Sequence, residues 1–107
     1  MVRDQDLRRE ELNALFAEIL GDENRVYFQP PDGTQMQYPA IVYRRDYADT
    51  TFADNAPYRY VKRYQVTVID KNPDSSIPAK VAALPMCSFN RYFPNGQLNH
   101  DVFNLYF

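Results

Sequence analysis

The stretch of sequence that decides the fold is residues 87–107, CSFNRYFPNGQLNHDVFNLYF. Two runs rich in aromatic residues flank a Pro-Asn-Gly turn at residues 94–96, which favours a β-hairpin. The sequence ends on Leu105, Tyr106 and Phe107. Ordering three large apolar side chains costs entropy that only burial recovers, so the run predicts a strand fixed in a sheet or against a partner subunit.

Successive side chains of a strand point to opposite faces, which divides this last strand into two sets. One face, which we expect in the core, holds Phe103, Leu105 and Phe107. The other face, which we expect nearer the surface or a neighbouring subunit, holds Val102, Asn104 and Tyr106.

The elements before the hairpin are a strand and a short helix. Residues 58–70 form the longest strand candidate of the chain, with successive side chains on alternate faces. Residues 72–76 supply turn and N-cap side chains. A short helix over residues 77–84 then follows, with Pro78 in its first turn and Pro85 ending it.

The N-terminal part predicts an amphipathic helix and two strands. A helix over residues 4–20 ends before Gly21, and its charged face is expected in solvent. Its apolar face is expected in the core and holds Leu12, Leu15, Phe16, Ile19 and Leu20. Short strands are predicted over residues 25–29 and 38–43.

Residues 44–57 form a polar stretch with interleaved aromatic side chains and no clear period. This pattern predicts a long loop, and long loops inside small domains are often functional. The order helix, strand, strand, loop, strand, helix, strand, strand predicts one α+β domain over residues 1–107. We expect a small mixed, largely antiparallel sheet with two helices packed on one face.

Composition excludes several classes of protein. The chain has 107 residues, a net charge of −2, nine Tyr, seven Phe and one Cys, so no internal disulfide can form. A single cysteine fits a reducing compartment. No apolar run approaches the ~18 residues of a membrane span, and no signal peptide is visible, so we expect no membrane association.

Catalytic or metal-binding patterns are weak. His100 precedes Asp101, but neighbouring residues of a strand point to opposite faces. Cys87 lacks any feature that would lower the pKa of its thiol and is expected to be a small core residue. The acidic residues Asp46, Asp49 and Asp54 do not have EF-hand spacing. We therefore expect no enzyme, no cofactor and no metal site.

Basic and aromatic residues mix in the middle of the chain. Such mixtures hold single-stranded nucleic acid, but the net charge is negative and RNA-recognition signatures are missing. Tyr and Arg are also favoured in protein interfaces, which is our preferred interpretation. The candidate subunit or partner interface comprises Arg44, Arg45, Tyr47, Phe52, Tyr58, Tyr60, Lys62 and Tyr106.

Three local stretches, together with the order of elements, carry a resemblance to a known family. They are YRYVKRYQVTVID at residues 58–70, the helix entry NPDS at 72–75, and FNR at 89–91 leading into LNHDVF at 98–103. Together they resemble the small minor tail or tail terminator (tail-completion) proteins of long-tailed phages and prophages of Gram-positive bacteria. The resemblance covers nearly the whole chain.

The resemblance implies a non-enzymatic virion protein with a tail-terminator-like fold. Such proteins form rings, typically hexamers, on the head-proximal end of the tail tube. The implied partners are further copies of the chain, the major tail-tube protein and a head-completion or connector protein, with DNA only as cargo passing through the lumen. The alternatives are a head–tail connector or head-completion protein and, from another class, a small nucleic-acid-binding module.

The hairpin interpretation makes a testable prediction about the C-terminus. Deleting residues 105–107 is expected to cost folding itself, because the deletion removes two core side chains from the last strand. Thermal melting followed by circular dichroism measures the effect. An unchanged melting temperature in the truncated chain would refute the assignment.

Overall fold

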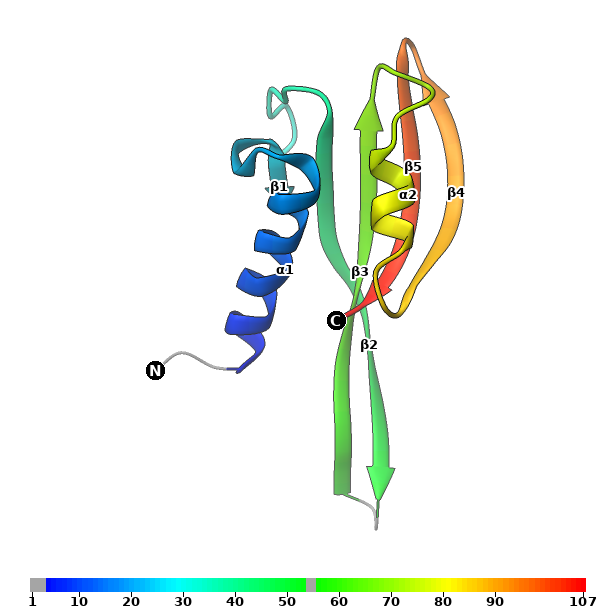
Figure 1. Cartoon of the computed structure of the whole chain (residues 1–107). Coiled ribbons are helices and arrows are strands. Elements are labelled where there is room, and N and C mark those ends of the chain that lie inside the picture. Colours follow the sequence, from blue (N-terminus) through cyan, green and yellow to red (C-terminus); the bar gives the residue numbers. More distant parts are fainter. Residues whose placement is uncertain (1–3, 54–55) are drawn as a thin grey trace.

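The computed structural model describes residues 4–53 and 56–107, with side chains for 8–53 and 60–107. Two helices, one 3₁₀ turn and five strands follow one another along the chain (Figure 1). In order they are helix α1 (Asp4–Leu20), turn η1 (Glu23–Arg25), strands β1 (Val26–Phe28), β2 (Ala40–Ala53) and β3 (Ala56–Asp70), helix α2 (Ile77–Ala82), and strands β4 (Cys87–Asn95) and β5 (Leu98–Tyr106).

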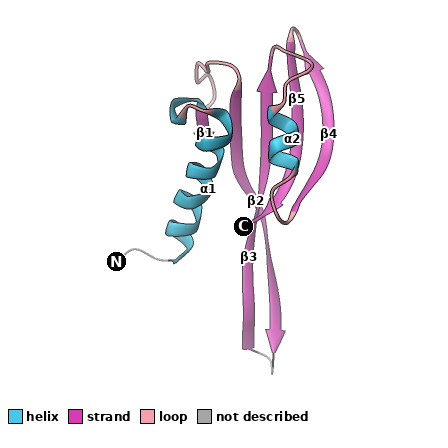
Figure 2. Cartoon of the chain, viewed as in Figure 1, coloured by secondary structure: helices cyan, strands magenta, loops and turns pink. Residues whose placement is uncertain are grey.

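The five strands form one sheet in the order β1-β2-β3-β5-β4. Strand β1 pairs parallel with β2, and the other three pairs of neighbours are antiparallel. Both helices lie on the same face of the sheet, here called the helix face (Figure 2). The predicted α+β fold, with a mixed, largely antiparallel sheet and two helices on one face, is confirmed.

The hydrophobic core lies between the helix face and the two helices. Alternate residues of β2, β3 and β5 point into it, as period-two alternation requires. Helix α1 adds two fully buried side chains and α2 adds one. The buried cluster is Leu12, Phe16, Ile41, Tyr43, Tyr64, Val66, Val68, Val81, Phe103 and Leu105. The remaining apolar residues of the predicted α1 stripe, Leu15, Ile19 and Leu20, are half-buried.

The predicted loop over residues 44–57 is wrong, because strands occupy almost all of it. β2 continues to Ala53 and β3 begins at Ala56. Register shifts between Arg45 and Tyr47 and between Thr51 and Phe52 interrupt the pairing. A bulge moves the following side chains to the other face of the sheet. The alternation that would have revealed a strand is therefore interrupted within a few residues.

The β2–β3 hairpin extends well beyond the rest of the sheet. Pairing of β3 with β5 ends at Arg63 opposite Tyr106, beyond which the N–H of Phe107 donates to the Lys62 carbonyl at 3.1 Å. The described residues of β3 before Lys62 pair with β2. We call residues 48–53 and 56–62 the arm. Seven residues at about 3.3 Å each give it a length of about 20 Å. It projects from one end of the body, which accounts for the extents of 51 × 30 × 25 Å (Figure 1).

The closing hairpin has the predicted faces with one exception. Phe103 and Leu105 are buried, and Phe107 packs against the same cluster. Val102, which was expected near the surface, is only 2% exposed. Strand β5 lies inside the sheet, so its cross-strand partners Thr67 and Arg91 flank Val102 on the face without helices.

Local signals fix the ends of several elements. Gly21 takes φ +84° and its N–H donates to the Ala17 carbonyl at 2.7 Å, as a glycine after a helix does. The Ser75 hydroxyl, one residue before the N-cap, accepts from the N–H of Ile77. In the hairpin the two turn residues are Gly96 and Gln97, since Asn95 pairs with Leu98. The positive φ at Gly96 fits the first central position of such a turn.

Two buried tyrosines form the centre of the core. The Tyr43 ring lies 5.1 Å from Phe16, 4.9 Å from Phe28 and 5.9 Å from Tyr64, measured between centroids. Its hydroxyl donates to Asn13 Oδ1 at 2.8 Å. Burial raises the pKa of Tyr43 and of Tyr64, because a phenolate would be poorly solvated there.

These raised pKa values predict that stability falls in alkaline solution. Above pH of about 10 the unfolded chain releases phenolic protons that the folded chain still holds. The folded state then binds more protons, so the free energy of unfolding decreases as pH rises through the folded pKa. Denaturant titrations between about pH 8 and 11 should show this decline, and Tyr43→Phe and Tyr64→Phe should each make it shallower. An identical decline in both variants would contradict the assignment.

Candidate interface: the arm and the groove at its base

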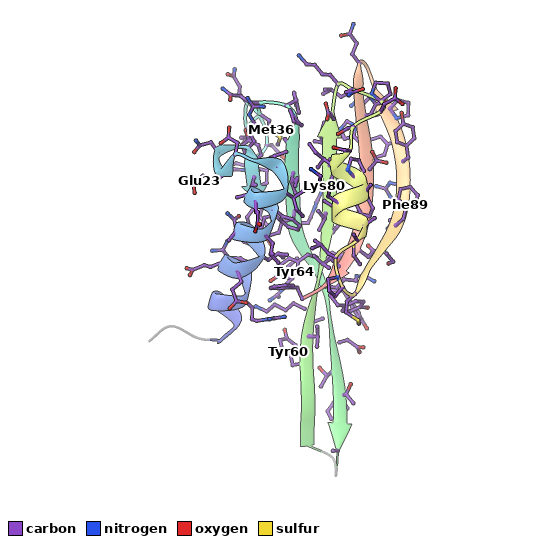
Figure 3. The ribbon with its side chains drawn as sticks, viewed as in Figure 1. Glu23, Met36, Tyr60, Tyr64, Lys80 and Phe89 are labelled. Carbon is purple, nitrogen blue, oxygen red and sulfur yellow. The ribbon has the colours of Figure 1, made fainter. Side chains whose placement is uncertain are left out.

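Large apolar side chains are exposed on and beside the arm. Phe52 and Tyr60 belong to the arm and are 65% and 47% exposed, and Tyr47 at its root is 50% exposed. Tyr60 lies on the helix face, four residues before the buried Tyr64 of the same strand (Figure 3). Tyr47 pairs with Arg63 on the opposite face. Among the described side chains, the arm therefore exposes aromatic surface on the helix face, and Tyr47 at its root exposes it on the other face.

An ion pair fixes the root of the arm at the first bulge. The Arg63 guanidinium donates to both carboxylate oxygens of Asp46, at 3.1 and 3.3 Å. It also lies 4.9 Å from the centre of the Tyr47 ring. The hydrogen bond to Asp46 raises the pKa of Arg63 further. A bidentate pair stacked on an aromatic ring holds the bulge, and thus the direction of the arm, in one geometry.

A groove with a volume of about 640 Å³ opens on the helix face at the base of the arm. Its walls come from α1, the connection between α2 and β4, the C-terminal strand and the first residues of the arm. Met86 is 64% exposed beside it and has φ +62°. The apolar lining is Leu15, Leu84, Pro85, Met86, Leu105 and Phe107.

Positive charge surrounds this groove. Arg8 lies 4.0 Å from the centre of the Phe107 ring and forms an exposed ion pair with Glu11 at 3.6 Å. Lys62 is part of the lining. The positive charges of Arg9, Arg45 and Arg8 act on the Tyr64 phenol in opposition to its burial. An apolar groove with a basic rim suits an apolar ligand segment that carries negative charge.

The structure separates the predicted interface residues into three places. Tyr60, Lys62 and Tyr106 line the groove, and Arg45 lies opposite Tyr64 on the same face. Tyr47 and Phe52 lie on the arm or at its root. Arg44 pairs with Gln65 on the other face. The backbone of Tyr58 belongs to β3, while its side chain lies outside the described residues.

The predicted interface contained three of the twelve residues that line the groove. Leu15 and Phe107 were expected in the core, and the groove that they line with Arg8 and Leu84 was not predicted. Met86 received no role, although an exposed methionine between a helix and a strand is a signal for an interaction surface. The groove exists because elements distant in sequence meet there, which no local pattern records.

The candidate catalytic residues are held apart. The His100 ring stacks on Phe93, with centroids 4.6 Å apart, and Asp101 points to the opposite face beside Val68. Burial raises the pKa of the Asp101 carboxyl and of the Cys87 thiol. The charged form of each side chain is therefore disfavoured. His100 and Asp101 therefore cannot act as a catalytic pair in this arrangement.

The acidic residues of the former loop are also separated. Asp46 binds Arg63, Asp49 is exposed on the arm, and Asp54 lies outside the described residues. Across residues 4–53 and 56–107, no three His, Cys, Asp or Glu side chains gather as metal ligands. In the same part of the chain no helix is long and apolar enough to cross a membrane.

Comparison with known proteins finds no matching family model and no matching curated protein.

The exposure of the arm predicts a contrast between two tyrosines of one strand. Tyr60→Ala should change the free energy of unfolding by no more than about 0.5 kcal/mol, as expected for a surface residue. Tyr64→Ala should cost about 3–5 kcal/mol, because it empties a fully buried aromatic site. Urea denaturation of both variants measures the difference. Comparable losses would show that the arm is packed in the isolated chain.

Proposed function

We propose that this chain is a non-enzymatic subunit of a phage tail terminator ring, with a hexamer as the expected form. The ring would cap the head-proximal end of the tail tube in the virion, stop tube polymerisation and join the tail to the head connector. The subunit would be made in the host cytoplasm and meet the tail-tube protein there. The observation that carries this proposal is the arm, with its exposed aromatic side chains.

An arm of this kind supports a role in assembly. A two-stranded ribbon is marginally stable in water unless its side chains pack against something. Here Tyr60 is exposed near the base of the arm and Phe52 near its far end. Aromatic residues in contiguous exposed positions are typical of protein interfaces. The arm is therefore best explained as a segment that packs against another subunit.

A ring on a tube also needs an axial surface besides the lateral contacts between subunits. The sheet face without helices offers one. A row of paired residues crosses all five strands on that face, and Val102 in its middle is buried by its neighbours alone. The row is Tyr27, Val42, Thr67, Val102 and Arg91. A sheet face without covering helices suits contact with a neighbouring ring of tube or connector protein.

The nucleic-acid alternative finds less support in the placement of the cations. Arg44 lies on one face of the sheet and Arg45 on the other, while Arg63 is engaged by Asp46. A strand of nucleic acid needs a continuous basic track along one surface. The basic residues of the middle segment are instead divided between two faces.

Electron microscopy of tail tubes tests the proposal. The protein is mixed with polymerising tail-tube protein encoded in the same gene cluster, and tube lengths are measured. We expect short tubes with a ring on one end, because a capped end accepts no further subunits. Tubes that grow without limit at a molar excess of this protein would refute the proposal.

Two further measurements separate the proposal from its alternatives. A head-completion protein would bind the connector and leave tube lengths unchanged, which the same images reveal. Binding to a labelled oligonucleotide at low salt would favour the nucleic-acid module, because that contact depends steeply on ionic strength. The variant Gln97→Asp is changed in the exposed turn of the β4–β5 hairpin. As a control it should cap tubes as the wild-type chain does.

A further inference from the structure

We propose that the arm of one copy of this chain docks in the groove of the next copy. The inference deepens the proposed function and rests on it, because it assigns the lateral contact of the ring. The contact would join two different surfaces, the arm tip around Phe52 and the groove beside Met86. Repeating it from copy to copy closes a ring when the rotation allows.

The arm cannot fill the groove of its own chain. Tyr60 and Lys62, at the base of the arm, form part of the groove wall. The two strands then continue away from the body as a paired ribbon (Figure 1). Phe52, near the far end, would have to fold back through its own ladder of hydrogen bonds. The occupant must therefore come from another molecule, and a second copy carries a suitable segment.

The shapes and polarities of the two surfaces match. The groove volume of about 640 Å³ is sufficient for several side chains and falls in the range of 300–1,000 Å³ typical of binding pockets. Its walls are mainly aliphatic and aromatic, and the exposed Met86 can adapt to an incoming ring. The arm tip offers Phe52 with small neighbours on each side, Thr51 and Ala53. A bulky ring between small residues can enter a groove without obstruction.

The charges are also complementary. The outer part of the arm, residues 48–59, contains Asp49, Asp54 and Arg59, a net charge of −1. The groove has Arg8 and Lys62 in its lining, with Arg9 and Arg45 acting on the nearby Tyr64. An acidic tip and a basic rim attract each other, whereas two tips or two rims repel. This favours a head-to-tail contact over a symmetric one.

Complementary variants of the purified chain alone test this contact. Phe52→Ser removes the arm anchor and keeps the groove, while Met86→Asp places a charge in the groove and keeps the arm. Both residues are largely exposed, and Asp tolerates the positive φ of Met86 better than most residues, so folding should be preserved. Thermal melting of each variant verifies that it is folded.

We expect the wild-type chain to form concentration-dependent oligomers in analytical ultracentrifugation. Each variant should associate at least about tenfold more weakly, as loss of an interface anchor does. A mixture of the two variants should form one-to-one dimers and nothing larger, because only one intact arm and one intact groove remain. Raising the salt concentration should weaken the wild-type oligomer. The control variants Phe89→Ser and Gln97→Asp, changed at exposed positions of the β4–β5 hairpin, should assemble as the wild type does.

Several results would overturn the inference. They are a wild-type chain that stays monomeric at all concentrations, variants that assemble normally, and a mixture that stays monomeric. These results would leave the tube-capping experiment untouched, since it uses the wild-type chain with tube protein. Unlimited tube growth with an intact arm–groove contact would instead refute only the proposed function.

Discussion

The antiparallel pairing of β2 with β3 is the interaction on which the rest of the structure depends. Its inner half, around Tyr43 and Tyr64, supplies side chains to the core beneath the helices. Its outer half has no other strand beside it and forms the arm. One continuous ladder of hydrogen bonds thus joins the core to the projecting surface, so the stability of the body also fixes where the arm points.

The two halves of this ribbon differ in what stabilises them. Around Tyr64 the strands are stabilised by apolar burial under α1 and by the pairing of β3 with β5. Around Tyr60 they have only backbone hydrogen bonds and cross-strand pairs, which are marginal for two strands in water. The Arg63–Asp46 pair lies at the boundary, where the bulge redirects β2. Such a change of environment within one hairpin is typical of a segment whose packing partner belongs to another molecule.

Much of the fold could be predicted because its signals are local. The helix over residues 4–20 was predicted at its observed bounds, from apolar periodicity and a terminal glycine. The closing hairpin followed from a turn between two aromatic runs, and alternation placed His100 and Asp101 on opposite faces. The prediction was wrong for residues 44–57, where a bulge at Asp46 hid the period of β2, and for Val102, which strand neighbours bury.

The sequence by itself determined the type of domain, the helix–sheet layering and the mixed polar and aromatic character of the segment that became the arm. These properties depend on spacing and composition within a few residues. Only the tertiary structure decided that this segment is a paired ribbon, and that Arg8, Leu15, Met86 and Phe107 meet at its base. The physical reason is that strand register across a bulge and a groove between helix, loop and terminus depend on contacts between residues far apart in the chain, which no local pattern encodes.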